Sequence, residues 1–177
     1  MTSSTMANSS QQNVDATQQK RIPETLRWRP MPAPKVDDDR SSPLVVVETP
    51  DTPAPCRRCL LDSKVGDQML LISYDPFLGD SPYRCASPIY LHSKPSCKLA
   101  AFGASGGFLP EQQRSRLLSV RAYDAKHMLQ AAEVVDGNRV LETLEGMLGE
   151  GAPAEYCHVH YAAHGCFAVR VERGDSA

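Results

Sequence analysis

Glycine and proline are distributed unevenly along this chain, and their distribution limits which residues can form a domain. All eleven glycines lie at Gly66 or later, whereas eight of the fourteen prolines lie at or before Pro55. Residues 1–43 contain few larger apolar side chains, too few to offset roughly 1–2 kcal/mol of backbone entropy per ordered residue. We therefore expect a disordered tail over residues 1–43 and a single folded domain over residues 44–174.

Composition and charge exclude several classes of protein. The chain has 177 residues, is 41% hydrophobic and carries a net charge of −2. A near-neutral chain has no field that would gather nucleic acid or anionic lipid. No apolar run approaches the roughly 18 residues of a membrane span. The first twenty residues contain no apolar segment typical of a secretory signal. We therefore expect neither a nucleic-acid nor a membrane partner, and a cytoplasmic location, with the nucleus as the alternative.

Several stretches after residue 43 have the patterns of strands. Leu44–Val47 is short, β-branched and flanked by prolines, which is typical of an edge strand. Residues 68–74 are apolar with little alternation, which suits a strand covered on both faces. Residues 117–123 alternate between apolar and polar positions. Further strands are expected over 88–92, 133–135, 155–162 and 166–172, with Ala163-His164-Gly165 as a short hairpin loop between the last two.

One amphipathic helix is expected at residues 138–148. Its apolar residues recur at helical spacing: Val140, Leu141, Leu144, Met147 and Leu148. Asp136-Gly137 is a turn signal just before it, and Pro110 favours a short helical turn through Arg114. Mostly strands with one clear helix indicate an α+β domain of mainly antiparallel sheet.

The segments taken in order resemble the small domain family known as domain of unknown function 1203. The resemblance spans roughly residues 55–173, and it rests on the order and spacing of several motifs. These are Pro55-Cys56-Arg57-Arg58-Cys59-Leu60, Gly66-Asp67-Gln68-Met69-Leu70-Leu71, Ser81-Pro82-Tyr83, Pro88-Ile89-Tyr90-Leu91-His92, Leu118-Ser119-Val120-Arg121-Ala122-Tyr123-Asp124, Tyr156-Cys157-His158-Val159-His160-Tyr161-Ala162 and Gly165-Cys166-Phe167. The resemblance implies a compact domain and no particular reaction.

The strongest candidates for metal ligands are the pairs Cys56/Cys59 and His158/His160. A Cys-x-x-Cys turn brings two thiolates to one ion, and zinc prefers thiolate and imidazole ligands. Two residues at i and i+2 of a strand share a face, so both histidines can reach the same ion. His92 with Cys97, or Cys166, are alternative ligands. The competing interpretation is buried thiols and hydrogen-bonded histidines, in a chain without a metal.

The register of the last hairpin separates these interpretations. A loop of two or four residues puts His158 and His160 on the apolar face of the following strand, with Phe167, where they would be buried and neutral. A loop of three residues puts them beside Cys166 and Arg170 on a polar face.

Two other classes of function remain open. In a cysteine/histidine-dependent enzyme, Cys166 beside His160 or His164 would act as a thiolate nucleophile. Arg121 and Asp124, at a strand end, would bind an anion, take part in acid–base chemistry or form only a local salt bridge. In a non-catalytic interaction module, a protein partner would bind through the tail or pair with the Leu44–Val47 edge.

Overall fold

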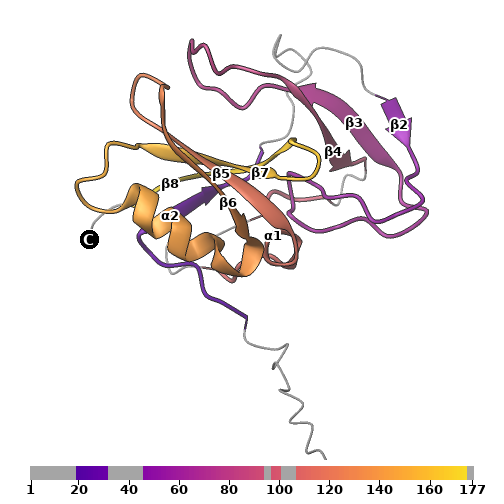
Figure 1. Ribbon diagram of the computed structural model, residues 1–177. Helices are drawn as coiled ribbons and strands as arrows, with labels where there is room; N and C mark the ends of the chain where they lie inside the picture. The colour runs from indigo at the N-terminus through magenta and orange to yellow at the C-terminus, as the bar shows by residue number, and fades with distance from the viewer. Residues whose placement is uncertain (1–18, 32–45, 94–96, 101–106, 175–177) are drawn as a thin grey trace, which may run out of the picture.

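The computed structural model describes residues 19–31, 46–93, 97–100 and 107–174, and within these residues the chain forms two antiparallel sheets (Figure 1). The larger sheet has the strand order β1-β8-β7-β5-β6, and the smaller has the order β2-β3-β4. The strands are β1 (Leu26–Arg29), β2 (Val46–Glu48), β3 (Met69–Tyr74), β4 (Ser87–His92), β5 (Leu117–Tyr123), β6 (Leu129–Asp136), β7 (Tyr156–Tyr161) and β8 (Phe167–Arg173). The helices are α1 (Glu111–Arg114), the 3₁₀-helix η2 (Gly137–Arg139) and α2 (Val140–Leu148). The expected α+β fold is therefore confirmed.

Helix α2 packs against one face of the larger sheet (Figure 1). The alternation predicted for residues 117–123 places Leu118, Val120 and Ala122 on this face, where all three are buried. The apolar side chains of α2 pack in the same buried hydrophobic cluster as these three residues. At nine residues α2 is the longest helix described, and none in the described ranges is long and apolar enough to span a membrane.

The opposite face of the larger sheet is also covered, so that all six residues of β7 are buried. The smaller sheet packs here through Tyr74, whose ring lies 5.6 Å from that of Phe167 on β8. The loop after β3 adds Phe77, whose ring lies 5.1 Å from that of Tyr123. The smaller sheet itself is less enclosed: Ile72 on β3 is buried but Ser73 is exposed, so the expectation of a strand covered on both faces does not hold for β3.

Residues 19–31 are part of the fold, which corrects the prediction of a tail through residue 43. Strand β1 pairs with β8, from Leu26 opposite Arg173 to Arg29 opposite Arg170. Trp28 is 3% exposed within the main core. The segment is ordered because β1 supplies a missing edge to β8 and buries an indole, neither of which depends on its local composition. The remainder of the predicted tail, residues 1–18 and 32–43, lies outside the described residues, as do Leu44 and Val45 of the predicted edge strand.

Replacing Trp28 tests whether β1 belongs to the domain. Trp28→Ala is expected to lower the free energy of unfolding by about 3–5 kcal/mol, because it removes a buried indole and leaves a cavity. The exposed strand neighbour Arg29 is the matched control: Arg29→Ala breaks only its surface ion pair with Glu172 and should cost about 1 kcal/mol or less. Urea denaturation followed by far-UV circular dichroism measures both. Equal, small losses would show that β1 does not contribute to the core.

The predicted turn at Asp136-Gly137 is the start of η2, where the chain passes very close to α1. A Cβ atom at Gly137 would lie 1.9 Å from the carbonyl oxygen of Gln113. The Gly137 amide donates to the carbonyl of Arg116 at 2.9 Å. Only glycine allows this approach, which fixes α1 against the start of α2.

Candidate metal centre and neighbouring cavity

Cys56 and Cys59 lie on a tight loop that the backbone holds closed. The amide of Cys56 donates to the carbonyl of Leu61 at 3.2 Å, and the amide of Leu60 donates to the carbonyl of Cys56 at 3.1 Å. Leu60 has a φ of 55°, a left-handed conformation that costs a non-glycine residue about 1–2 kcal/mol. Its side chain is 2% exposed in the main core, so burial holds the strained residue in place. Strain of this kind is characteristic of functional sites.

Two further residues, His92 and Cys97, complete the group. Cys56 forms an isolated parallel bridge with Tyr90, which brings the end of β4 alongside the loop. One potential ligand atom from each of Cys56, Cys59, His92 and Cys97 lies within 4.8 Å of all the others. The sulfur atoms of Cys56 and Cys97 are 3.7 Å apart, and Cys59 Sγ lies 3.4 Å from His92 Nδ1.

These separations match a tetrahedral zinc site. Thiolate sulfurs about 2.3 Å from a zinc ion stand about 3.8 Å apart at the tetrahedral angle, and a sulfur and an imidazole nitrogen about 3.6 Å apart. The Cys56–Cys97 and Cys59–His92 distances agree with these values to within about 0.2 Å. Two of the six ligand–ligand distances therefore suit a single ion with three sulfur ligands and one nitrogen ligand, and the other four lie within 4.8 Å.

The protonation of the thiols favours an added cation. A hydrogen bond from the Cys59 thiol lowers the pKa of Cys56 to about 4, against the opposing effect of burial. The same bond raises the pKa of Cys59, and burial followed by the charge of Cys56 raises that of Cys97. Three thiols this close cannot all be anionic by themselves, whereas a coordinated metal ion deprotonates each of them.

Groups around the four residues are placed as outer partners of a metal centre. His92 Nε2 lies 4.0 Å from the carboxylate of Asp67, on the side of the ring away from Cys59. Carboxylates in this position orient metal-bound imidazoles. The positive charge of Arg58 favours the thiolate of Cys97. A pocket of about 410 Å³ opens on Cys59, His92 and Cys97, which gives an ion a route in.

The structure brings Cys56 and Cys59 together with His92 and Cys97, which sequence reasoning held only as alternative ligands. His158 and His160 lie in a different cluster. The sequence does contain one signal for the second pair: His92, at the end of a strand, and Cys97 are potential ligands separated by four residues. What the sequence does not contain is the contact between the end of β4 and the Cys56 loop.

His158 and His160 lie among aromatic rings on the covered face of the larger sheet. The ring of His158 is 4.9 Å from that of Phe77 and 5.4 Å from that of Phe167. His158 is 0% exposed, and neither of its ring nitrogens has a hydrogen-bond partner among the residues described. Burial lowers its pKa to about 2 and that of His160 to about 4. Both imidazoles are therefore neutral at physiological pH.

The register of the last hairpin combines features of both expected loops. Five residues separate β7 from β8, and a β-bulge lies between Val159 and His160. His158 faces Arg170 across the ladder, as the polar register requires, whereas His160 faces Phe167, as the apolar register requires. The bulge moves Phe167 onto the histidine face, away from Val169, which is why apolar alternation predicted the wrong face for Phe167.

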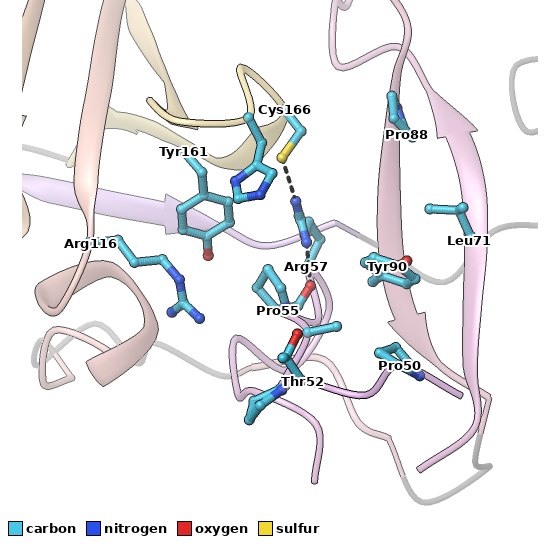
Figure 2. Close-up of a pocket in the computed structure, with 13 residues that line it drawn as sticks. Pro50, Thr52, Pro55, Arg57, Leu71, Pro88, Tyr90, Arg116, Tyr161 and Cys166 are labelled. Atoms are coloured by element: carbon cyan, nitrogen blue, oxygen red, sulfur yellow. Dashed lines mark hydrogen bonds between the residues drawn. The ribbon is translucent and has the colours of Figure 1, made fainter. Parts of the chain in front are cut away.

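Arg57, between the two cysteines of the loop, points into a separate cavity of about 560 Å³ (Figure 2). Its side chain is 1% exposed, and its hydrogen bonds go to the carbonyl oxygens of Phe167 (2.8 Å) and Pro55 and to the Cys166 sulfur at 2.9 Å. Burial lowers the pKa of Arg57, while the nearby Cys166 raises it. No carboxylate pairs with this guanidinium among the described residues.

The remaining predicted site residues are placed apart from the metal ligands. Asp124 accepts bonds from the amides of Lys126 and Met128 at 2.8 and 2.9 Å, so it closes the β5–β6 turn. Arg121 donates to Ser119 at 3.3 Å, and no salt bridge to Asp124 occurs in the described ranges.

Cys166 lines the Arg57 cavity together with His164. The thiolate-enzyme interpretation stays a prediction, as does the interaction module, whose expected edge strand corresponds to β2 at the edge of the smaller sheet.

Comparison with known proteins gives one match. The family described as protein of unknown function, DUF1203, matches residues 53–173. No curated protein and no solved structure matches the chain. The matched segment contains all four clustered ligands and Arg57, whereas β1 and the cavity-lining Pro50 and Thr52 precede it.

Proposed function

We propose that this chain, which belongs to the DUF1203 family of proteins of unknown function, binds one zinc ion through Cys56, Cys59, His92 and Cys97. The observation that supports this most directly is the approach of four ligand atoms to within 4.8 Å of one another. Three thiolates and one imidazole fill the four positions that zinc uses in structural sites. The ion would have no open position for a substrate, so its role is to stabilise the fold.

The ion would join three segments that lie far apart in the sequence. These are the Cys56–Cys59 loop, the end of β4 at His92 and the segment around Cys97. Among the described residues, backbone bonds already join them, such as Arg57 to Tyr90 at 3.0 Å and Ala100 to Arg58 at 2.9 Å, and Cys56, Leu91 and Cys97 share one buried cluster. Zinc with three thiolates carries one net negative charge, which the neighbouring Arg58 would offset.

Metal content of the purified protein tests the proposal directly. Protein expressed without a histidine tag is expected to contain about one zinc per chain by inductively coupled plasma mass spectrometry. Cys59→Ser and His92→Ala should each reduce this to a small fraction, because a three-ligand site with neutral serine or alanine binds zinc far more weakly. Cobalt exchanged into the wild type should give the intense visible absorption of tetrahedral thiolate coordination.

Cys85→Ser is the matched control, because Cys85 is an exposed cysteine outside the cluster. It should keep the full zinc content and the cobalt spectrum. His160→Asn is a second control, since His160 was the ligand expected from sequence and lies in the aromatic cluster. Zinc well below one equivalent in the wild type, or zinc lost on His160→Asn and kept on His92→Ala, would reject the proposed ligand set.

A further inference from the structure

The cavity beside Arg57 has chemically distinct walls. One wall is cationic and polar, formed by Arg57, Arg116, Tyr161 and Cys166 (Figure 2). Across from Tyr161 and Arg116, Figure 2 shows a mostly apolar wall formed by Leu71, Pro88 and Tyr90 of the smaller sheet with Pro50. Pro53 and Pro55 add further apolar lining. The cavity's volume of about 560 Å³ lies within the range of sites for small organic molecules.

The positive charge of Arg57 is the unusual feature of this cavity. Its three hydrogen-bond acceptors are two carbonyl oxygens and the sulfur of Cys166, and none of them is a carboxylate. Buried cations are almost always paired with an anion, because an unpaired charge away from water is costly. Three of the five N–H donors of the guanidinium make these bonds, which leaves two for a ligand.

Arg116 adds a second guanidinium without adding much net charge. Its side chain lies over the Tyr161 ring, 5.3 Å from the ring centroid, and Arg57 lies 5.0 Å from the same ring. Arg116 already pairs with Asp62 at 2.7 Å. Among the described residues of the polar wall, the charge left without an anionic partner is therefore that of Arg57, which matches a ligand with one negative charge.

We propose that this cavity binds a small organic carboxylate, with its carboxylate at Arg57 and its apolar body against the wall formed by Tyr90, Leu71 and the prolines. A guanidinium presents paired donors to a carboxylate, and low exposure keeps the attraction from being screened by water. The apolar wall distinguishes this ligand from inorganic phosphate, which has no apolar body to bury. The site is distinct from the metal centre, although Arg57 is positioned by the loop that carries Cys56 and Cys59.

The rate at which Cys166 is alkylated tests whether the cavity prefers a negatively charged reagent over a neutral one. Iodoacetate and iodoacetamide react by the same step: the sulfur bonds to the methylene carbon, iodide leaves with the electron pair, and the thiol proton passes to solvent. They differ in that iodoacetate is itself a small carboxylate. Cys85, which is exposed and lies outside the cavity, is an internal reference in the same molecules. Mass spectrometry of peptides resolves the two rates.

The ratio of the iodoacetate rate to the iodoacetamide rate is expected to be about tenfold higher at Cys166 than at Cys85, the factor that corresponds to about 1.4 kcal/mol. Arg57→Gln should bring the two ratios together. Because Arg57 is buried and its replacement can prevent folding, competition in the wild-type protein provides a second measurement. Benzoate should slow iodoacetamide at Cys166, whereas the neutral isostere benzamide should not.

Each outcome decides the proposal. Equal ratios at Cys166 and Cys85, or equal protection by benzoate and benzamide, would overturn the carboxylate site. If phosphate protected Cys166 from iodoacetamide as strongly as benzoate does, the proposal that the ligand has an apolar organic body would be wrong. Zinc content is measured on the same protein preparations. If the protein contains zinc but Cys166 shows no preference for iodoacetate, only the carboxylate site is rejected. If the protein contains no zinc but Cys166 still prefers iodoacetate, only the metal proposal is rejected.

Discussion

Stripping the metal from this protein with a strong chelator is expected to lower its melting temperature by about 10 °C or more. A structural zinc ion binds the folded chain and not the unfolded one, so its binding free energy adds to stability. Even about 3 kcal/mol of lost stability would shift the midpoint by roughly 6–12 °C in a domain of this size. Differential scanning fluorimetry with and without chelator measures the shift, and added zinc should reverse it.

The variants that remove a ligand make this result specific. Cys97→Ser should melt at about the temperature of the chelated wild type, and chelator should then have little further effect on it. Cys85→Ser should behave as the wild type does, because Cys85 is exposed and outside the cluster. If the wild type melts at the same temperature with and without chelator, the four residues are free thiols and an imidazole, and zinc does not stabilise the fold.

The Cys56/Cys59 pair shows how far local sequence predicts the candidate site. The spacing of the pair is enough to bring two sulfurs to one side of a turn, and this does not depend on the rest of the fold. His92 and Cys97 complete the group only because the Cys56 loop forms a parallel bridge with Tyr90, more than thirty residues away. A contact of that kind arises from tertiary packing, so the four-residue set could not be derived from spacing alone.

Local sequence does not predict strand β1 or the β8 bulge, for a related reason. Leu26–Arg29 has only two apolar residues, and proline-rich polar segments flank it. It is a strand because β8 offers an edge and the core accepts Trp28. The bulge beside Val159 shifts which residues of β8 share a face with His158, and strict alternation cannot represent one extra residue. The helix and the strands with regular patterns, by contrast, were predicted correctly.

Lowering the pH from 7 to 5 is expected to destabilise the domain through its buried histidines. The pKa of His158 is about 2 in the folded protein, because burial and then its cationic neighbours oppose a second positive charge. In the unfolded chain it returns to about 6.5. Between these values the unfolded state binds one more proton, so stability rises with pH and is lost as pH falls below about 6.5. The loss from pH 7 to pH 5 is about 2 kcal/mol for His158.

His160 adds to this loss in the same direction. Its pKa of about 4 is lowered by burial and the charge of Arg121, although a hydrogen bond with the carbonyl of Gly165 partly opposes the shift. Arg170 and Arg121 also oppose a positive charge on His158. The two histidines together would cost the folded state about 3–4 kcal/mol at pH 5, a large part of the 5–15 kcal/mol that typical domains possess.

His158→Phe isolates this contribution. Phenylalanine keeps the edge-to-face contacts with Phe77 and Phe167 but has no ring nitrogen to leave unpaired, so the variant should be about 1–3 kcal/mol more stable at pH 7. The difference from the wild type should widen by about 2 kcal/mol at pH 5, because only the wild type takes up a proton at this position on unfolding. His158→Gln is the matched control: it removes the titration while keeping a buried polar group, so it should flatten the pH dependence without the gain at pH 7. Urea denaturation at both pH values, with zinc in excess so that metal release does not differ between variants, measures all three proteins. A constant difference between wild type and His158→Phe would mean that His158 is already protonated in the folded protein or accessible to water.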